Sequence, residues 1–324
     1  MASINTYDIL AIGTPIVDQL IMTTDEFLQK IHGPRGGSES VDYETLCKLL
    51  KNSGHSPVSA TGGCAANTIK GLAQLGHNCA LFGKLGNDEA GLYFQRTMEE
   101  LGIISKLQIV NKPTAQVACL ISPDHERTMR SFLGAGLEMK AQDLDSEIFK
   151  NVKLLHIEAY LLDRDPLVQH SMELAKAAGA KISFDLANFE IVEKYKKQMI
   201  DLLSNYVDIV FANNEETQAL TGLGGEAGCD ILKDICEIAV VKLGDKGCLA
   251  AQDQEKVFQP GFTVNAVDTT GAGDLFASGF LHGYLQQKEL KECARYGNLV
   301  ASFVVQMVGT EMMPEMWQSI KKQL

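Results

Sequence analysis

The stretch Asp268-Thr-Thr-Gly-Ala-Gly-Asp274 stands between two runs of different character. Residues 262–267 before it alternate and are rich in β-branched side chains, which predicts a strand. Residues 275–285 after it are apolar and rich in small residues, with Gly279 and Gly283 one turn apart, which predicts a closely packed, buried helix. A helix that starts after a strand and a glycine-rich turn exposes amides without intrahelical partners, so an anion can bind there.

Asp274 stands at the start of this predicted helix. A carboxylate beside an anion-binding turn can take a proton from a hydroxyl while the amides stabilise a transferring phosphoryl group. Asp is also a common N-cap, so from this motif alone a structural role stays open. The sequence has no GxxxxGK[ST], which argues against a P-loop mechanism. The nearest match to GxGxxG, residues 222–227, follows a predicted helix rather than a strand, which argues against a nicotinamide-dependent dehydrogenase.

The composition limits the class of protein. The chain has 324 residues, 45% of them hydrophobic and 22% charged, which suits one α/β domain with a sizeable core. The net charge of −12 argues against nucleic acid or an anionic membrane as the main partner. No basic leader or long apolar run occurs near the start, so we expect neither a signal peptide nor a membrane span. The eight cysteines lack zinc spacing and lie mostly in apolar runs, which predicts a cytoplasmic protein.

Strand and helix patterns alternate along most of the chain. This alternation predicts right-handed βαβ crossovers and a doubly wound, mainly parallel sheet with helices on both faces. Residues 115–121 and 127–133 are two extended runs whose spacing suits a hairpin, which does not fit inside a parallel sheet. We therefore expect one domain, 1–324, with a small β-sheet lid built from about 14–45 and 113–134. The strands expected in the main sheet cover 7–13, 79–82, 152–157, 181–186, 207–212 and 238–243.

Polar residues and glycines stand near the ends of the first predicted elements. Asp18 follows the strand 7–13 closely, where a ligand of an open α/β sheet would bind, although such an Asp is more often a solvated turn residue. Gly62 and Gly63 open a helix that carries Asn67 in its first turns. The glycine pair indicates either a tight turn or close approach of a ligand to the backbone, with Asn67 as a hydrogen-bond donor.

Two later strand ends carry similar alternatives. Asn213 and Glu216 have the spacing of a helix capping box, but at a strand end Glu216 could also hold hydrated Mg²⁺. The turn from Gly244 to Gly247 is either a plain turn or a backbone wall for a nucleotide. The histidines show no pairing at metal spacing, and Arg127 in the predicted hairpin is by default a surface residue.

With these parts in place, the chain resembles the ribokinase-like family, also called the PfkB carbohydrate kinases. Residues 268–274, followed by Leu275, Phe276 and Gly279, are similar to the family's C-terminal signature. The segment 62–67 is similar to its N-terminal signature, and Asn213-x-x-Glu216 resembles its NxxE motif. The resemblance runs from about residue 7 to about residue 310 and implies a doubly wound kinase with a small β lid, which would keep water out during transfer.

The resemblance also implies a role for each matching residue. Asp274 would be the base that activates a substrate hydroxyl, and the amides of Gly271, Ala272 and Gly273 would form the anion hole for the γ-phosphate of ATP. Glu216 would support Mg²⁺ through water. The other implied positions are substrate binding by Asp18, Gly62, Gly63, Asn67 and Arg127, nucleotide binding by Asn213, Lys242, Gly244, Gly247 and Asn298, and a monovalent cation such as K⁺, bound in some members, at Asp268 and Thr270.

The acceptor stays open between a nucleoside and a sugar. The runs 123–129, 158–162 and 211–216 look most like the family's bacterial adenosine-kinase-like subgroup, although Ala159 stands where that subgroup often has glycine. Residues 64–66 lack the lysine of ribokinases proper, which weakens ribose as the substrate.

Three further points concern the alternative functions, the assembly and the acceptor site. A fructose- or ribose-type sugar kinase and a non-catalytic nucleotide-binding regulator remain the alternatives. Extended lid strands can pair between subunits, so the fold allows a homodimer. A purine acceptor needs an aromatic wall, for which the candidates are Phe132, Tyr160 and Phe189.

Overall fold

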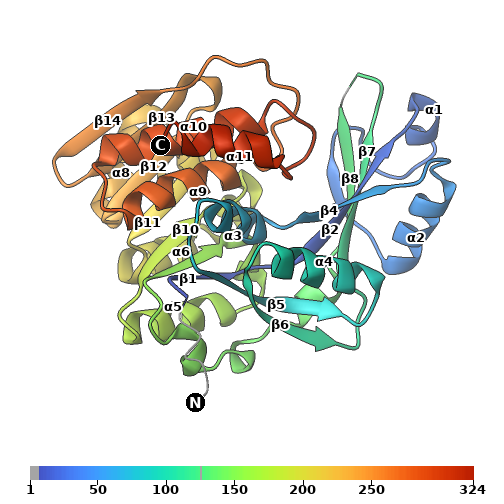
Figure 1. Ribbon diagram of the computed structural model, residues 1–324, viewed down its shortest axis with the longest axis horizontal. Helices are drawn as coiled ribbons and strands as arrows, with labels where there is room; N and C mark the ends of the chain where they lie inside the picture. The colour runs from blue at the N-terminus through green and yellow to red at the C-terminus, as the bar shows by residue number, and fades with distance from the viewer. Residues whose placement is uncertain (1–6, 125) are drawn as a thin grey trace.

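The computed structural model describes residues 7–124 and 126–324 (Figure 1). Within them, the main body is a nine-stranded sheet in the order β14-β13-β12-β11-β10-β9-β1-β5-β6. The strands from β12 to β6 in this order run parallel, whereas β13 and β14 are antiparallel additions at one edge. These strands are β1 Ile9–Ile12, β5 Cys79–Gly86, β6 Ile104–Val110, β9 Leu154–Glu158, β10 Lys181–Asp185, β11 Ile209–Asn213, β12 Ile238–Lys242, β13 Gly247–Gln252 and β14 Glu255–Pro260.

Helices cover both faces of this sheet, which confirms the predicted doubly wound α/β fold. Because successive strand residues point to opposite faces, Leu10 and Ile12 join one core with α5 to α8, while Ile9 and Ala11 join the other with α3, α4, α9 and α10. The helices of the main body are α3 Cys64–Gln74, α4 Glu89–Glu100, α5 Leu167–Ala177, α6 Phe189–Tyr206, α7 Asn214–Thr221, α8 Gly225–Ile235, α9 Ala272–Leu285, α10 Leu290–Val304 and α11 Pro314–Lys321.

The strand order fixes where a ligand can bind. From β1 the chain continues to β5 and β6 on one side and later returns to β9 on the other side. This reversal beside β1 is a topological switch point, and open α/β sheets bind ligands outside the carboxyl ends of the strands at such a point.

The α9–α10 pair packs as the glycines predicted. A Cβ atom on Gly279 would lie 2.4 Å from the Tyr296 carbonyl oxygen of α10. The strand predicted for 262–267 is wrong: this segment is a surface connection in which Phe262 and Val267 are exposed. It follows β14, the edge of the sheet, so no further strand of the described chain lies beside it to pair, and the amide of Val267 donates instead to the Val305 carbonyl at 2.7 Å.

A second sheet of the described chain has five strands, in the order β3-β8-β7-β2-β4 (Figure 1, right). The hairpin predicted from 115–121 and 127–133 is confirmed as the antiparallel pair of β7 and β8. The sheet also includes β4, which lies outside the two segments predicted for it, and it carries helices α1 Asp25–Leu28 and α2 Tyr43–Asn52. Its strands are β2 Ile16–Met22, β3 Ser38–Ser40, β4 Val58–Gly62, β7 Ala115–Ile121 and β8 Arg127–Phe132.

No helix of the described chain combines the length and the apolar character that a membrane crossing requires.

Candidate functional site

Two glycine-rich segments that are far apart in the sequence meet at Asp274. Asn67, in the first turn of α3, donates from Nδ2 to Asp274 Oδ2 at 2.9 Å. The neighbouring Thr68 hydroxyl donates to the Asp274 carbonyl at 3.1 Å, and the Thr310 hydroxyl donates to Asn67 Oδ1 at 3.2 Å. The N-terminal ends of α3 and α9 are thus joined through side chains of both predicted signatures.

The start of α9 is open to an anion. Gly271 is the N-cap, in the left-handed conformation with φ 69°, and no side chain caps this helix end. Asp274 is therefore the third residue inside the helix, and its carboxylate binds Asn67 rather than capping its own helix. Within the described chain the amides of Gly271 and Gly273 find no acceptor, whereas the Ala272 amide donates to the Thr269 carbonyl at 3.2 Å. Two of the three amides expected in the anion hole are unoccupied, and the third is partly engaged.

The surroundings of Asp274 raise the pKa of its carboxyl group toward neutral pH. Protein atoms replace most of the water around the carboxylate, and this burial raises its pKa to about 7. The hydrogen bond from Asn67 and the charge of Lys242 work in the opposite direction, while the Asp185 carboxylate adds to the rise. A carboxylate with a pKa near the working pH is suited to general base catalysis.

The glycine pair explains how Asp18 reaches this area. A Cβ atom on Gly62 would lie 2.3 Å from Asp18 Oδ2, and one on Gly63 would lie 2.3 Å from the Thr14 carbonyl oxygen. Gly63 also has φ 96°, which side chains rarely adopt. Burial raises the pKa of Asp18 to about 6, partly offset by the charges of Lys70 and Arg127. The pair therefore forms a tight turn that Asp18 and the Thr14 carbonyl approach closely, while the approach of a ligand to this backbone stays a prediction.

Arg127 is not the surface residue that its residue type predicted. Its side chain is 13% exposed, and its guanidinium forms an ion pair with the Asp268 carboxylate. It also donates to Thr270 Oγ1 at 2.6 Å. Asp268 further accepts from the amides of Thr270 and Gly309 at 3.0 and 2.7 Å. The two residues expected to bind a monovalent cation are thus the partners of an arginine from the second sheet.

Asn213 and Glu216 form the predicted capping box at the start of α7. Asn213 Oδ1 accepts from the Glu216 amide at 2.8 Å, and Glu216 accepts from the Asn213 amide and Nδ2 at 2.7 and 2.6 Å. Burial raises the pKa of Glu216 to about 7, against the lowering effect of Lys242.

The capping box leaves Glu216 able to take part in Mg²⁺ binding, directly or through water. Each Glu216 oxygen accepts one hydrogen bond and keeps a second lone pair free for water. Among the described residues no three His, Cys, Asp or Glu side chains cluster as metal ligands would.

The remaining predicted nucleotide residues lie together at the edge of the main sheet. Gly244 starts a short 3-10 turn, and Gly247 follows it with φ 106°, where a Cβ would lie 2.1 Å from the Gln259 carbonyl oxygen. Asn298 of α10 donates from Nδ2 to the carbonyls of Gln259 and Pro260 at 3.0 and 3.2 Å. Asn298 therefore holds the end of β14 beside the turn, and this amide nitrogen is already used.

Two carboxylates that the sequence interpretation did not select also lie at strand ends. Glu158 ends β9 and accepts from the Ala65 amide of α3 at 2.7 Å, and burial raises its pKa to about 7. Asp185 ends β10, in register with Glu158, and forms an ion pair with Lys242 at 2.9 Å. The rule that selected Asp18, an acid where a parallel strand ends, would have selected both.

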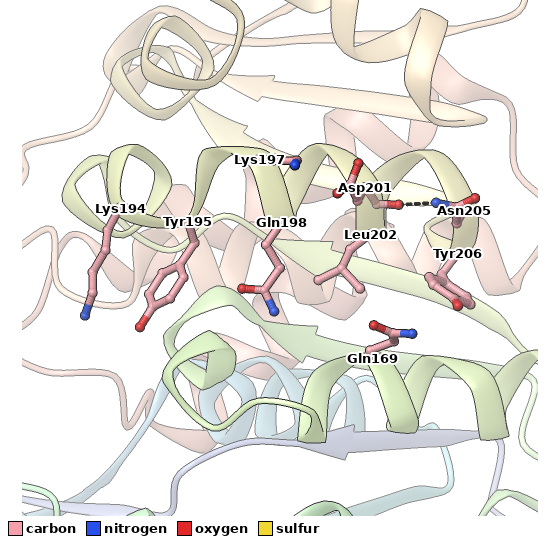
Figure 2. A pocket seen from close by; sticks show the side chains of 9 residues that line it. All are labelled: Gln169, Lys194, Tyr195, Lys197, Gln198, Asp201, Leu202, Asn205 and Tyr206. Carbon is pink, nitrogen blue, oxygen red and sulfur yellow. Dashed lines mark hydrogen bonds between the residues drawn. The ribbon is translucent and has the colours of Figure 1, made fainter.

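Three hollows of the described surface do not include Asp274. One of about 430 Å³ runs between α5 and α6, lined by polar side chains such as Gln169 and Gln198 (Figure 2). Another, of about 990 Å³, lies on the second sheet near Arg130. A third, of about 170 Å³, is lined by residues that include Asn67 and Trp317. None of these three has the predicted base in its wall.

Comparison with known proteins gives consistent matches over nearly the whole chain. A protein-family model described as pfkB family carbohydrate kinase matches residues 41–316. The solved structure of a probable sugar kinase from Rhizobium etli is similar with a TM-score of 0.89 and 31% identity, covering 98% of both chains. That of an adenosine kinase from Sinorhizobium meliloti has a TM-score of 0.88 and 31% identity, covering 98% of this chain and 100% of that one. A nucleoside kinase from Methanothermobacter thermautotrophicus is 26% identical over 322 residues, 97% of this chain and 95% of that protein.

Proposed function

The chain belongs to the PfkB family of carbohydrate kinases, whose members phosphorylate sugars or nucleosides, and we propose that it transfers the γ-phosphoryl group of ATP to a hydroxymethyl group of an adenosine-like nucleoside. The observation that carries this proposal is the contact of Asn67 with Asp274 beside the unpaired amides of Gly271 and Gly273. It combines a base of near-neutral pKa with an anion-binding helix start.

The proposed transfer needs few chemical groups. The hydroxyl of the acceptor gives its proton to Asp274, and its oxygen forms a bond to the γ-phosphorus as the bond from that phosphorus to the β–γ bridging oxygen breaks, which leaves ADP. Phosphoryl transfer depends mainly on positioning and charge neutralisation, with one base for the hydroxyl proton. Asp18, for which Gly62 leaves room, is the proposed hydrogen-bond partner of the acceptor hydroxyls.

On the nucleotide side, Glu216 is the proposed support for Mg²⁺ through water. When bound, Mg²⁺ neutralises phosphate charge. The turn from Gly244 to Gly247, held next to Asn298, is the proposed wall of the nucleotide site, with Asn213 beside it. Binding of K⁺ at Asp268 and Thr270 stays a prediction, and it would require Arg127 to leave both residues.

The proposed nucleoside specificity rests on two observations. The 31% identity to the Sinorhizobium meliloti adenosine kinase extends over nearly the whole chain. In addition, Tyr160 and Phe189 are exposed aromatic residues that follow the ends of β9 and β10, and an exposed ring there can stack on a purine. Phe132, the third candidate, packs against Tyr43 with ring centroids 5.1 Å apart, which makes it a weaker one.

A sugar acceptor is the second candidate, favoured by the equal identity to the Rhizobium etli probable sugar kinase. The experiment that separates the two measures ADP release with Mg-ATP in the presence of adenosine, other nucleosides, ribose or fructose. Tyr160→Ala provides the matched variant: it should raise the KM for a nucleoside about 5- to 150-fold, because base stacking contributes about 1–3 kcal/mol, and leave a sugar's KM unchanged. Strong turnover with fructose or ribose and none with nucleosides would favour the sugar kinase.

Two further parts of the proposal concern assembly and location. β3 and β4 are the edges of the second sheet, and within the described chain each pairs with a strand on one side only, which supports a homodimer through that sheet. Light scattering after size exclusion tests it, since a monomer at assay concentration contradicts it. The eight cysteines are all unpaired, which supports a reducing cytoplasm.

A further inference from the structure

Lys242 occupies a position between the two halves of the proposed site. It is the last residue of β12, and its side chain extends across the end of β11 to Asp185, the last residue of β10. The ammonium lies 2.9 Å from Asp185 Oδ2. It also lies 3.1 Å from the position that a Cβ atom on Gly273 would occupy. The ammonium is therefore adjacent to the anion-binding start of α9, and glycine at position 273 leaves room for it.

The ammonium has donors to spare. A lysine carries three N–H donors, and within the described residues only the one to Asp185 meets an acceptor. The side chain of Lys242 is 16% exposed, so the remaining donors are sheltered but accessible from the site. An anion bound by the amides of Gly271 and Gly273 would lie beside them.

Asp185 fixes where this charge points. Its side chain is 9% exposed, its Oδ1 accepts from the Ala187 amide at 2.8 Å, and its Oδ2 accepts from Lys242. One oxygen anchors the carboxylate to the backbone and the other holds the lysine, so the ammonium cannot swing toward Glu216 or solvent without losing its ion pair. Burial alone would lower the pKa of Lys242, but the surrounding carboxylates outweigh it and raise the pKa, which keeps the amine charged.

We propose that Lys242 binds the γ-phosphoryl group of ATP during transfer and neutralises its charge, and that Asp185 is the residue that positions it. This inference rests on the proposed phosphoryl transfer and extends it by naming which phosphate the lysine contacts. The Lys242–Asp185 pair would then be part of the catalytic machinery rather than only an ion pair between two strands.

The test compares Lys242→Met, Lys242→Arg and Asp185→Asn with a matched control. Asp208→Asn removes a carboxylate of the same 9% exposure that pairs with Lys181 at the opposite end of β10, far from the strand ends that form the site. For each variant, kcat is measured together with the affinities for ATP and for ADP by calorimetry and with the melting temperature. Lys242→Arg shows whether a positive charge at this position is sufficient for activity. It also keeps the test informative if Lys242→Met folds poorly.

The expected pattern separates the γ-phosphate from the rest of the nucleotide. Lys242→Met should lower kcat about 10²- to 10³-fold, as expected for loss of a group that stabilises transition-state charge, and weaken ATP about tenfold with ADP within about twofold. Asp185→Asn should lower kcat about 10- to 10²-fold and weaken ATP less than Lys242→Met does, again with ADP within about twofold. Lys242→Arg should restore part of the loss, and Asp208→Asn should change only the melting temperature.

Two results overturn the inference. One is a Lys242→Met enzyme whose kcat stays within about threefold of the Asp208→Asn control. The other is an equal loss of ATP and ADP affinity. This result would mean that the lysine contacts another phosphate or only stabilises the folded protein. If the parent protein phosphorylates no acceptor but Lys242→Met still loses affinity for ATP alone, the proposed function fails while the assignment of Lys242 to the γ-phosphate stands.

Discussion

Arg127, at the start of β8, forms an ion pair with Asp268, which lies 141 residues later and opens the glycine-rich stretch before α9. The same guanidinium donates to Thr270 at 2.6 Å. The second sheet is thus connected to the loop that leads into the anion-binding helix start. Because both partners are also the residues expected to bind a monovalent cation, the arginine supplies positive charge at that place.

Removal of this charge should create a cation requirement. We expect Arg127→Met to raise the KM for the acceptor about tenfold and to make activity depend on K⁺, because Asp268 would be left buried without a counter-charge. The measurement is kcat/KM as a function of K⁺ concentration at constant ionic strength. Arg35→Met is the matched control, since Arg35 pairs with Asp25 and Asp124 within the second sheet and its connections. A parent enzyme as dependent on K⁺ as the variant would contradict this role.

A methyl group at position 62 should disturb only the acceptor side. A Cβ atom on Gly62 would lie 2.3 Å from Asp18 Oδ2, so Gly62→Ala must displace that carboxylate. We expect the acceptor KM to rise at least about tenfold, since an interaction of roughly 1.4 kcal/mol is lost, while the affinity for ATP stays unchanged. Asp18→Asn should give the same effect. If Gly62→Ala weakens ATP instead, the assignment of Asp18 to the acceptor is wrong.

The pH dependence should reflect the base. Because burial raises the pKa of Asp274 to about 7, the carboxylate becomes protonated below that pH and can no longer accept the hydroxyl proton. We expect kcat/KM to fall as the pH decreases through about 7, with roughly a tenfold loss per pH unit on the acid side. Glu216→Gln serves as the control because burial also raises the pKa of Glu216 to about 7. An acid limb that disappears in Glu216→Gln would assign it to that residue.

The same pKa shift predicts a stability effect of definite sign. The folded pKa of Asp274 is raised from 3.8 to about 7, so the ionised carboxylate costs stability, and this cost grows as the pH rises from about 4 to about 7. Asp274→Asn should therefore be about 2–4 kcal/mol more stable than the parent at pH 8, at 1.36 kcal/mol per pKa unit less the weakened Asn67 contact. The difference should shrink at pH 5. Urea unfolding at both pH values measures it, and a variant less stable than the parent at pH 8 would refute the prediction.

The fold was predictable where local rules and tertiary packing agree. The capping spacing of Asn213 and Glu216, the pairing of 115–121 with 127–132 and the strand–helix rhythm from 152 onward are all present in the structure. The failures lie at sheet edges. Residues 262–267 alternate but have no strand beside them. β6 and β14 are edge strands and β13 lies next to β14, although no strand was predicted for any of the three. Edge pairing depends on which neighbour the fold supplies, and a local pattern does not contain that information.

The candidate site was predictable in its motifs and not in its partners. Asn67 and Asp274 were each selected from a signature, but their contact was not predicted. The pairing of Lys242 with Asp185 depends on strand order, because β11 lies between them. Arg127 was assigned to the surface by residue type, and only the position of the second sheet brings it to Asp268. These contacts are set by tertiary geometry rather than by spacing along the chain.

The most direct test of the central claim is ADP release with Mg-ATP and the acceptor panel, run in parallel for the parent protein and Asp274→Asn. We predict strong release with one acceptor of the adenosine type and a loss of about 10³-fold or more in the variant, with ATP affinity retained within about threefold, because only the proton acceptor has been removed. Turnover in Asp274→Asn equal to that of the parent would contradict the assignment of Asp274 as the base.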